Sequence, residues 1–177
     1  MRYIIVDLEA TCRESGMPRT EMEIIEIGAV ELLAPTAEPT RAFARFVRPV
    51  LHPDLSEFCS NLTTIVQHDV DTAESFPAVF AAFLEWIGPE PYQLCSWGAY
   101  DLGQFLQDCT RHGITPPETF TPERHLNLKK RFSEKYAVKP MGMAGALRLL
   151  GLPLVGQHHR GIDDAYNIAA IARQLLG

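Results

Sequence analysis

Residues 2–9, Arg-Tyr-Ile-Ile-Val-Asp-Leu-Glu, decide the fold. A run of aromatic and β-branched residues of this kind predicts a strand. Side chains two residues apart share one face of a strand, so Asp7 and Glu9 are expected side by side. The opposite face is aliphatic and carries Ile4, Val6 and Leu8. Two acids at the end of an apolar strand repel each other, so they indicate either a hard metal ion between them or a strand that simply emerges into solvent.

Outward from this strand, the chain contains two more β-rich segments, residues 24–33 and 41–50, and a later one at 92–97. Three strands in succession predict a meander of hairpins. The expected helices share an apolar helical period or clear stop signals, and they fall near 63–68, 76–87, 100–111, 124–136, 142–150 and 162–176. The order predicts one α/β domain over residues 1–177 with a mixed sheet, because no repeat or linker divides the chain.

The composition excludes several classes of protein. At 177 residues and 46% hydrophobic, the chain can bury a full core, which excludes a disordered regulator. No apolar run is long enough for a bilayer, and Asp7 comes too early for a secretory signal, so no membrane partner and a cytoplasmic location are expected. The cysteines lie far apart and are expected to be reduced and mostly buried thiols: Cys12, Cys59, Cys95 and Cys109.

The charge is divided unevenly along the chain. The net charge of −6 alone argues against nucleic acid, because phosphate binding needs Lys and Arg. Residues 1–110 hold 6 basic and 17 acidic side chains, whereas residues 111–177 hold 10 and 5. This asymmetry suits an acidic metal-binding half and a phosphate-facing half, or merely solvated helix faces. The basic residues that could follow a nucleic-acid backbone are Lys129, Lys130, Arg131, Lys135 and Lys139.

The last predicted helix adds another acid. Its apolar stripe contains Ile168 and Ile171, and Asp164 falls inside that stripe. An acid aimed at the apolar side of a helix needs a metal, a base or a buried donor, unless it lies at an exposed edge. Asp163 falls instead on a polar face together with Asn167, where a capping role is expected.

Three further residues are candidates on their positions. Asp101 follows the strand at 92–97 and opens a helix, where an acid is ordinary on its own. His158 and His159 precede the last helix, on a loop. A loop histidine is usually a surface or structural group, but beside a carboxylate cluster it is also what a general base requires, because its pKa lies near the working pH.

Five motifs follow one another along nearly the whole chain: Asp-Leu-Glu-Ala-Thr-Cys at 7–12, Glu-Ile-Ile-Glu-Ile-Gly at 23–28, Leu-Thr-Thr-Ile at 62–65, Ser-Trp-Gly-Ala-Tyr-Asp at 96–101, and His-Arg-Gly-Ile-Asp-Asp-Ala-Tyr-Asn at 159–167. Together they resemble the DEDDh family of 3′-5′ exonucleases, nearest to the histone-mRNA and small-RNA 3′ exonuclease subgroup and its bacterial KapD-like relatives. The resemblance implies a ribonuclease H-like fold, with a mixed five-stranded sheet flanked by helices.

The resemblance also implies a mechanism. Two Mg²⁺ or Mn²⁺ ions would be held by Asp7, Glu9, Asp101 and Asp164, with Asp7 bridging both. Glu9 and Asp164 would serve the ion that activates water, and Asp101 the other ion or its waters. The family's last motif places its histidine five residues before its aspartate, which selects His159 as the general base. The expected product is a nucleoside 5′-monophosphate.

The substrate is expected to be single-stranded or 3′-overhang nucleic acid. The binding residues that the resemblance implies are Leu8, Ala10, Thr11, Leu62, Thr63, Trp97 and His159. Trp97 could equally belong to the core. Glu26 could orient the terminal sugar or balance strand arginines.

Three other activities compete with an RNA exonuclease. The first is a proofreading exonuclease acting on DNA, but that branch usually reads His-Asn-Ala-x-Phe-Asp where this chain has Ser-Trp-Gly-Ala-Tyr-Asp at 96–101, so RNA is favoured. The second is a nucleic-acid-binding module that keeps the fold without turnover. The third is a phosphate-transfer enzyme with an aspartate nucleophile, which leaves the His159 and Asp164 motif without a role.

Overall fold

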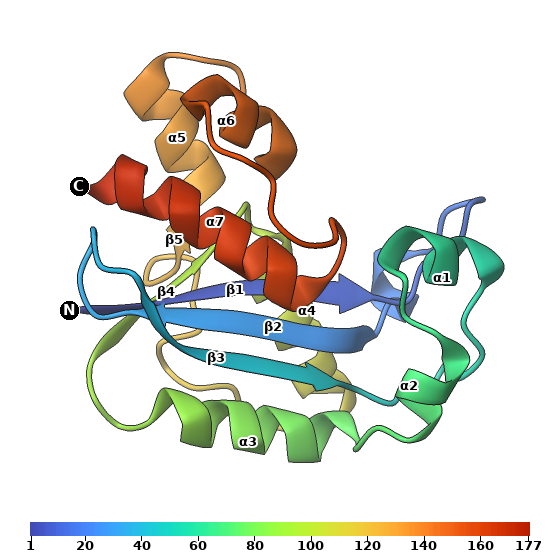
Figure 1. The fold of residues 1–177 in the computed structure, drawn as a ribbon. Helices are drawn as coiled ribbons and strands as arrows, with labels where there is room; N and C mark the ends of the chain where they lie inside the picture. Colours follow the sequence, from blue (N-terminus) through green and yellow to red (C-terminus); the bar gives the residue numbers. More distant parts are fainter.

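A computed structural model describes all residues 1–177, and its centre is one mixed sheet of five strands in the order β3-β2-β1-β4-β5 (Figure 1). The strands β1 (Arg2–Ala10), β2 (Ile24–Leu32) and β3 (Pro39–Phe46) form an antiparallel meander. Next to β1, β4 (Tyr92–Ser96) and β5 (Leu126–Asn127) continue the sheet in parallel. The predicted mixed five-stranded sheet is confirmed, although β3 starts and ends earlier than the predicted strand.

Helices cover both faces of this sheet, as Figure 1 shows. On one face, α3 (Phe76–Ile87) and α4 (Tyr100–Arg111) pack on the aliphatic side chains of β1, Ile4, Val6 and Leu8. On the other face, α5 (Leu128–Tyr136), α6 (Met143–Leu150) and α7 (Gly161–Leu176) pack around Ile5. The predicted alternation along β1 is therefore confirmed. No helix here is long and apolar enough to cross a membrane.

The bounds of the helix expected near 63–68 are wrong. Two short helices take its place, α1 (Glu57–Thr63) and α2 (Gln67–Asp71). Thr64 adopts the left-handed conformation, with φ of 62°, and this conformation ends α1. Val66 is extended and precedes α2. The apolar spacing alone did not reveal this break.

The helix expected from residue 124 begins later, at Leu128. Leu126 and Asn127 are extended and pair with Cys95 and Ser96 of β4. The Asn127 side chain then accepts a hydrogen bond from the backbone N–H of Lys130 at 2.9 Å, and this N-cap sets the start of α5. The pairing with β4 thus takes precedence over the local helical pattern.

The start of α7 touches the sheet backbone directly. Gly28 on β2 is the partner of Asp7 across the β1–β2 ladder. A Cβ atom on Gly28 would lie 2.0 Å from the carbonyl carbon of Gly161, the first residue of α7. A Cβ atom on Gly161 would lie 2.9 Å from the carbonyl oxygen of Asp7. The two glycines therefore permit a close approach that places the first turn of α7 beside Asp7.

Gly28→Ala is expected to lower the free energy of unfolding by about 3 kcal/mol or more, because the added methyl group meets backbone atoms that cannot rotate away. Gly145→Ala is the matched control, since its Cβ would meet only the flexible side chain of Met141, at 3.3 Å, and alanine favours the helix there. Urea unfolding of both variants measures the difference. An unchanged midpoint for Gly28→Ala would contradict the close approach.

Candidate active site

Three carboxylates from two ends of the chain meet at the end of β1. Asp7, Glu9 and Asp164 each offer an oxygen, and these oxygens all lie within 4.8 Å of one another. β1 carries the first two side chains on its α7-facing side, and the first turn of α7 carries Asp164. The cluster opens into a cavity of about 330 Å³, which Trp97 and Tyr100 also line. Since Asp164 is 4% exposed, the prediction of an inward-facing acid on the last helix is confirmed.

The acids of this cluster repel one another. Burial raises the pKa of Asp7 well above its usual value, and the nearby charges of Asp101 and Glu9 raise it further. Burial raises the pKa of Glu9 to about 8, and the charge of Glu26 adds to this rise. Oxygens on opposite sides of one Mg²⁺ lie about 4.2 Å apart, because each bond is about 2.1 Å long. The donor set, its spacing and its excess negative charge all fit divalent cations.

Asp101 joins the cavity from the first turn of α4. Its Oδ1 accepts a hydrogen bond from the backbone N–H of Leu8 at 3.1 Å, which links α4 to β1 beside Asp7. Burial raises the pKa of Asp101 to about 6, while the hydroxyl of Ser96 and this N–H oppose the rise. Asp101 is not one of the three acids whose oxygens lie within 4.8 Å of one another, so it stands at the side of the cluster.

Both loop histidines reach Asp164. The Nδ1 atom of His158 lies 2.8 Å from Oδ2 of Asp164, and the backbone N–H of His159 donates to the same oxygen at 3.0 Å. The two rings stack with their centroids 3.9 Å apart. His159 has a φ of 65°, a left-handed conformation that this bonded loop holds in place. Burial lowers the pKa of His159, and the charge of His158 lowers it too, against the opposite effect of Asp164.

Glu26 fixes the position of this loop. It is only 2% exposed, and its Oε2 accepts hydrogen bonds from Gly161 N at 2.9 Å and from Arg160 Nε at 3.1 Å. The expectation that strand arginines balance Glu26 is wrong, because its carboxylate is bound by Arg160 of the loop before α7. Glu26 also faces Glu9 across the β1–β2 ladder. The ion pair therefore ties the histidine loop to the strand that borders the acids.

Asn167 corrects another expectation. The helical pattern placed it on a polar face together with Asp163, but it is 2% exposed. Its amide donates to the carbonyl oxygen of Val155 at 2.8 Å and accepts from the N–H of the same residue at 2.9 Å. These two bonds satisfy the buried amide and hold the start of the histidine loop against α7.

Known exonucleases resemble this chain in sequence and in fold. The sequence model of an exonuclease family, RNase T, matches residues 4–172. The solved nuclease domain of 3′hExo, described as a DEDDh family member and bound to rAMP, matches with a TM-score of 0.90 and 32% identity over 99% of this chain and 91% of that one. The chain belongs to the DEDDh 3′-5′ exonuclease family.

Other relatives are matched along nearly the whole chain. Human 3′-5′ exoribonuclease 1 is 34% identical over 97% of this chain and 51% of its own length. The 3′-5′ exonuclease Snipper of Drosophila melanogaster is 31% identical over 98% of this chain and 69% of its own. A structure concerning recognition of the 3′ end of a histone mRNA stem-loop by 3′-exonuclease has a TM-score of 0.92 at 32% identity, covering 99% and 63% of the two chains. The chain spans about half the length of the human relative.

The structure divides the predicted substrate residues of this DEDDh chain into two groups. Leu8, Trp97 and His159 line the cavity with the acids. Trp97 also packs against Phe132 and donates its indole N–H to the carbonyl oxygen of Met141 at 3.0 Å, so it belongs to both the cavity wall and the core. The residues outside that cavity wall are Ala10, Thr11, Leu62 and Thr63.

The polar members of this second group are already bonded within the protein. The hydroxyl of Thr63 donates to the carbonyl oxygen of Cys59 at 2.8 Å, and Thr63 is fully buried. The hydroxyl of Thr11 accepts from the backbone N–H of Glu23 at 3.0 Å. These contacts hold α1 and the start of the loop after β1, and the roles of all four residues in a DEDDh substrate site stay predictions.

Tyr100 was not singled out for this DEDDh site from the sequence, and His158 was considered only beside His159. Tyr100 lines the cavity immediately before Asp101, and His158 contacts Asp164. The signal for Tyr100 was its place directly before Asp101 in the Ser-Trp-Gly-Ala-Tyr-Asp motif. His158 was visible as a second histidine, but only the three-dimensional loop shows that its ring turns toward the acid.

Proposed function

We propose that this protein is a metal-dependent 3′-5′ exonuclease that shortens RNA from a free 3′ end and releases nucleoside 5′-monophosphates. The observation that carries the proposal is the meeting of the Asp7, Glu9 and Asp164 oxygens within 4.8 Å, in a cavity that Asp101 and His159 also line. The name of the human relative, an exoribonuclease, and the similar structure that concerns a histone mRNA stem-loop support RNA as the substrate. The four unpaired cysteines are consistent with the reducing cytoplasm as its location.

The four acids Asp7, Glu9, Asp101 and Asp164 would hold two divalent metal ions, Mg²⁺ or Mn²⁺. Such ions supply positive charge for the scissile phosphate and lower the pKa of water. The fold brings the oxygens of Asp7, Glu9 and Asp164 within 4.8 Å of one another although the acids repel one another, so three ligand positions are set before any ion binds. Asp7 on β1 lies near both Asp101 of α4 and Asp164 of α7, whose charges raise its pKa, and this position suits it to serve both ions.

His159 would accept the proton of the attacking water. Its pKa is lowered by burial, so its ring is neutral and able to accept a proton at neutral pH. The backbone bond from His159 to Asp164 and the Glu26–Arg160 pair fix the loop that carries the ring. The terminal nucleotide would lie against Trp97 and Leu8, where an aromatic face and an aliphatic residue border the acids.

The test is a gel time course with purified protein and 5′-labelled single-stranded RNA and DNA of one sequence, each with Mg²⁺, Mn²⁺ or EDTA. The expected result is a ladder that shortens from the 3′ end, requires metal, and is faster on RNA. Equal or faster loss of DNA would overturn RNA as the preferred substrate. Binding of both strands without cleavage would leave a nucleic-acid-binding module instead.

A further inference from the structure

A second cavity adjoins the proposed active site. It measures about 470 Å³ and lies between the first turns of α4 and the β5–α5 segment. Ala99 lines it, directly before Tyr100 and Asp101, which line the catalytic cavity. We name it the α4–α5 groove; its lining residues that matter below are Gly103, His125, Asn127, Lys130, Arg131 and Glu134. The two cavities are therefore separated only by the start of α4.

Arg19 lies across this boundary. Its guanidinium stands 4.7 Å from the centre of the Tyr100 ring, and Nη2 lies 3.5 Å from the carbonyl oxygen of Tyr100. A Cβ atom on Gly103 would lie 3.2 Å from the same Nη2. Arg19 thus reaches from a residue of the catalytic cavity to a residue of the groove. Glycine within a helix costs stability, and here it leaves room for this side chain.

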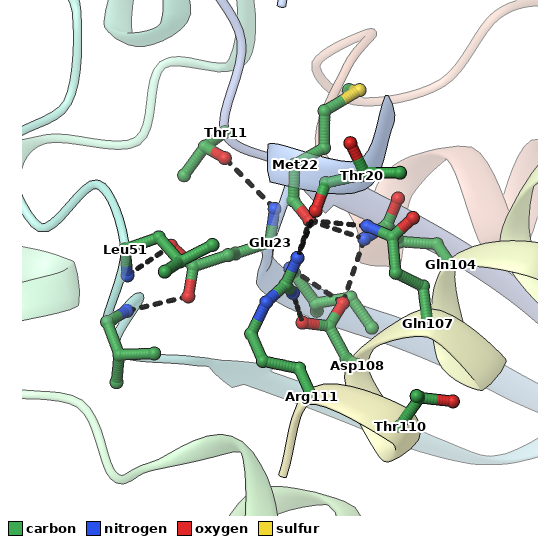
Figure 2. A network of polar contacts seen from close by, with 12 residues as sticks. Thr11, Thr20, Met22, Glu23, Leu51, Gln104, Gln107, Asp108, Thr110 and Arg111 are labelled. Carbon is green, nitrogen blue, oxygen red and sulfur yellow. Dashed lines mark hydrogen bonds and ion pairs between the residues drawn. The ribbon is translucent and has the colours of Figure 1, made fainter. Parts of the chain in front are cut away.

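The backbone that carries Arg19 is firmly attached to α4, as Figure 2 shows for the neighbouring residues. Gln107 donates to the carbonyl oxygen of Arg19 at 2.7 Å, and Arg111 donates to that of Thr20 at 2.8 Å. Gln107 and Arg111 also both donate to the carbonyl oxygen of Met22. Because the backbone is held at several points, a ligand that binds the guanidinium need not order the loop first.

The cations of this region have no acidic partner. Arg19, Lys130 and Arg131 have no carboxylate within 4.0 Å, whereas other arginines, such as Arg2 and Arg160, are paired with buried acids. Glu134 is the only acid that lines the groove. An unpaired cation at the boundary and two more in the groove form a positive path that begins beside the catalytic acids. Such a path fits a chain of phosphates.

We propose that the α4–α5 groove binds the nucleotides upstream of the terminal one, with Arg19 contacting the first upstream phosphate and Lys130 and Arg131 contacting later ones. This inference rests on the proposed function, since it assumes that the scissile phosphate lies at the acids. The ligand is a single-stranded oligonucleotide. The groove would make longer oligonucleotides bind more tightly and would not take part in the chemistry at the scissile bond.

Equilibrium binding tests the proposal separately from cleavage. Labelled single-stranded RNA is titrated with protein in EDTA at several salt concentrations, and the slope of log K against log salt is measured. Arg19→Ala is expected to reduce this slope by about 0.7, and the double variant Lys130→Ala/Arg131→Ala by about 1.4, because each phosphate contact on a single strand contributes about 0.7. Arg148→Ala, an exposed and unpaired arginine on α6, is the control and is expected to keep the wild-type slope.

Cleavage of a length series then locates the contacts. The ratio of KM for Arg19→Ala to KM for wild type is expected to rise with oligonucleotide length toward about tenfold, and Arg19→Lys is expected to restore most of the loss. The rise in KM for Lys130→Ala/Arg131→Ala is expected to begin at a longer oligonucleotide than the rise in KM for Arg19→Ala. An unchanged salt slope, or a KM ratio that does not depend on oligonucleotide length, would overturn the proposed role of the groove. Absent cleavage by wild type, with the slopes as expected, would overturn the proposed function alone.

Discussion

Asp7→Asn is expected to reduce cleavage to below about 1% of the wild-type rate, because it removes a proposed ligand of the metal ions that would stabilise the transition state. Burial raises the pKa of Asp7, and the charges of Asp101, Glu9 and Asp164 raise it further, so all three acids lie near it. Asparagine keeps the shape of the side chain and cannot hold a divalent cation as the carboxylate does. Initial rates with saturating Mg²⁺ measure the loss.

The same substitution is expected to stabilise the metal-free protein at neutral pH. Folding raises the pKa of Asp7, and that of Glu9 to about 8, so the folded state favours their protonated forms. The stability of the metal-free protein should therefore fall as pH rises from the usual carboxyl pKa through about 8. Melting temperatures in EDTA at low and high pH should show this fall, and a smaller one for Asp7→Asn.

Asp54→Asn serves as the control for both measurements, because Asp54 is an exposed acid away from the cavity. It is expected to keep the wild-type rate and melting temperature. If Asp7→Asn instead unfolds the protein with and without metal, Asp7 is a structural residue, and the metal-binding role is wrong.

His159→Ala is expected to lower the rate by roughly 10²–10⁴-fold, since it removes the proposed acceptor of the proton of water. Burial holds the pKa of His159 below its usual value. A base acts in its neutral form, so the wild-type rate should rise with pH through that lowered pKa and then level off. The variant should lose this rise. Single-turnover rates across pH measure both effects.

His158→Ala is the matched variant for this experiment. Its ring bonds to Asp164 and stacks on His159, so it shares the environment without the proposed role. It is expected to retain the rise of rate with pH. If His158→Ala loses the rise and His159→Ala keeps it, the two histidines exchange roles. If neither loses it, proton transfer to this loop is not part of the reaction.

The sequence predicted those parts of the site that depend on the periodicity of one strand or one helix. Alternation in β1 put Asp7 and Glu9 on one face, and the helical stripe of α7 turned Asp164 inward; the structure confirms both placements. It could not predict contacts between elements that are distant in the chain. The approach of Gly28 to Gly161 depends on two backbones meeting, and neither glycine signals the other locally.

The sequence also did not reveal which side chains from distant parts of the chain would become partners. Glu26 could have met any of several arginines, and only the folded loop selects Arg160. Asn167 looked polar and exposed on a helical wheel, yet its partner is the backbone of Val155, which no side-chain pattern encodes. Short elements such as α1 and α2 were misplaced for a related reason, since the left-handed Thr64 that separates them carries no strong sequence signal.

The carboxylate cluster draws one half from β1, the first strand, and the other from α7, the last helix. During synthesis the two halves cannot meet until α7 has left the ribosome and docked against Gly28. A partly made chain thus carries the acids of β1 without Asp164 or His159. The acid cluster is therefore complete only after α7 has docked against the sheet.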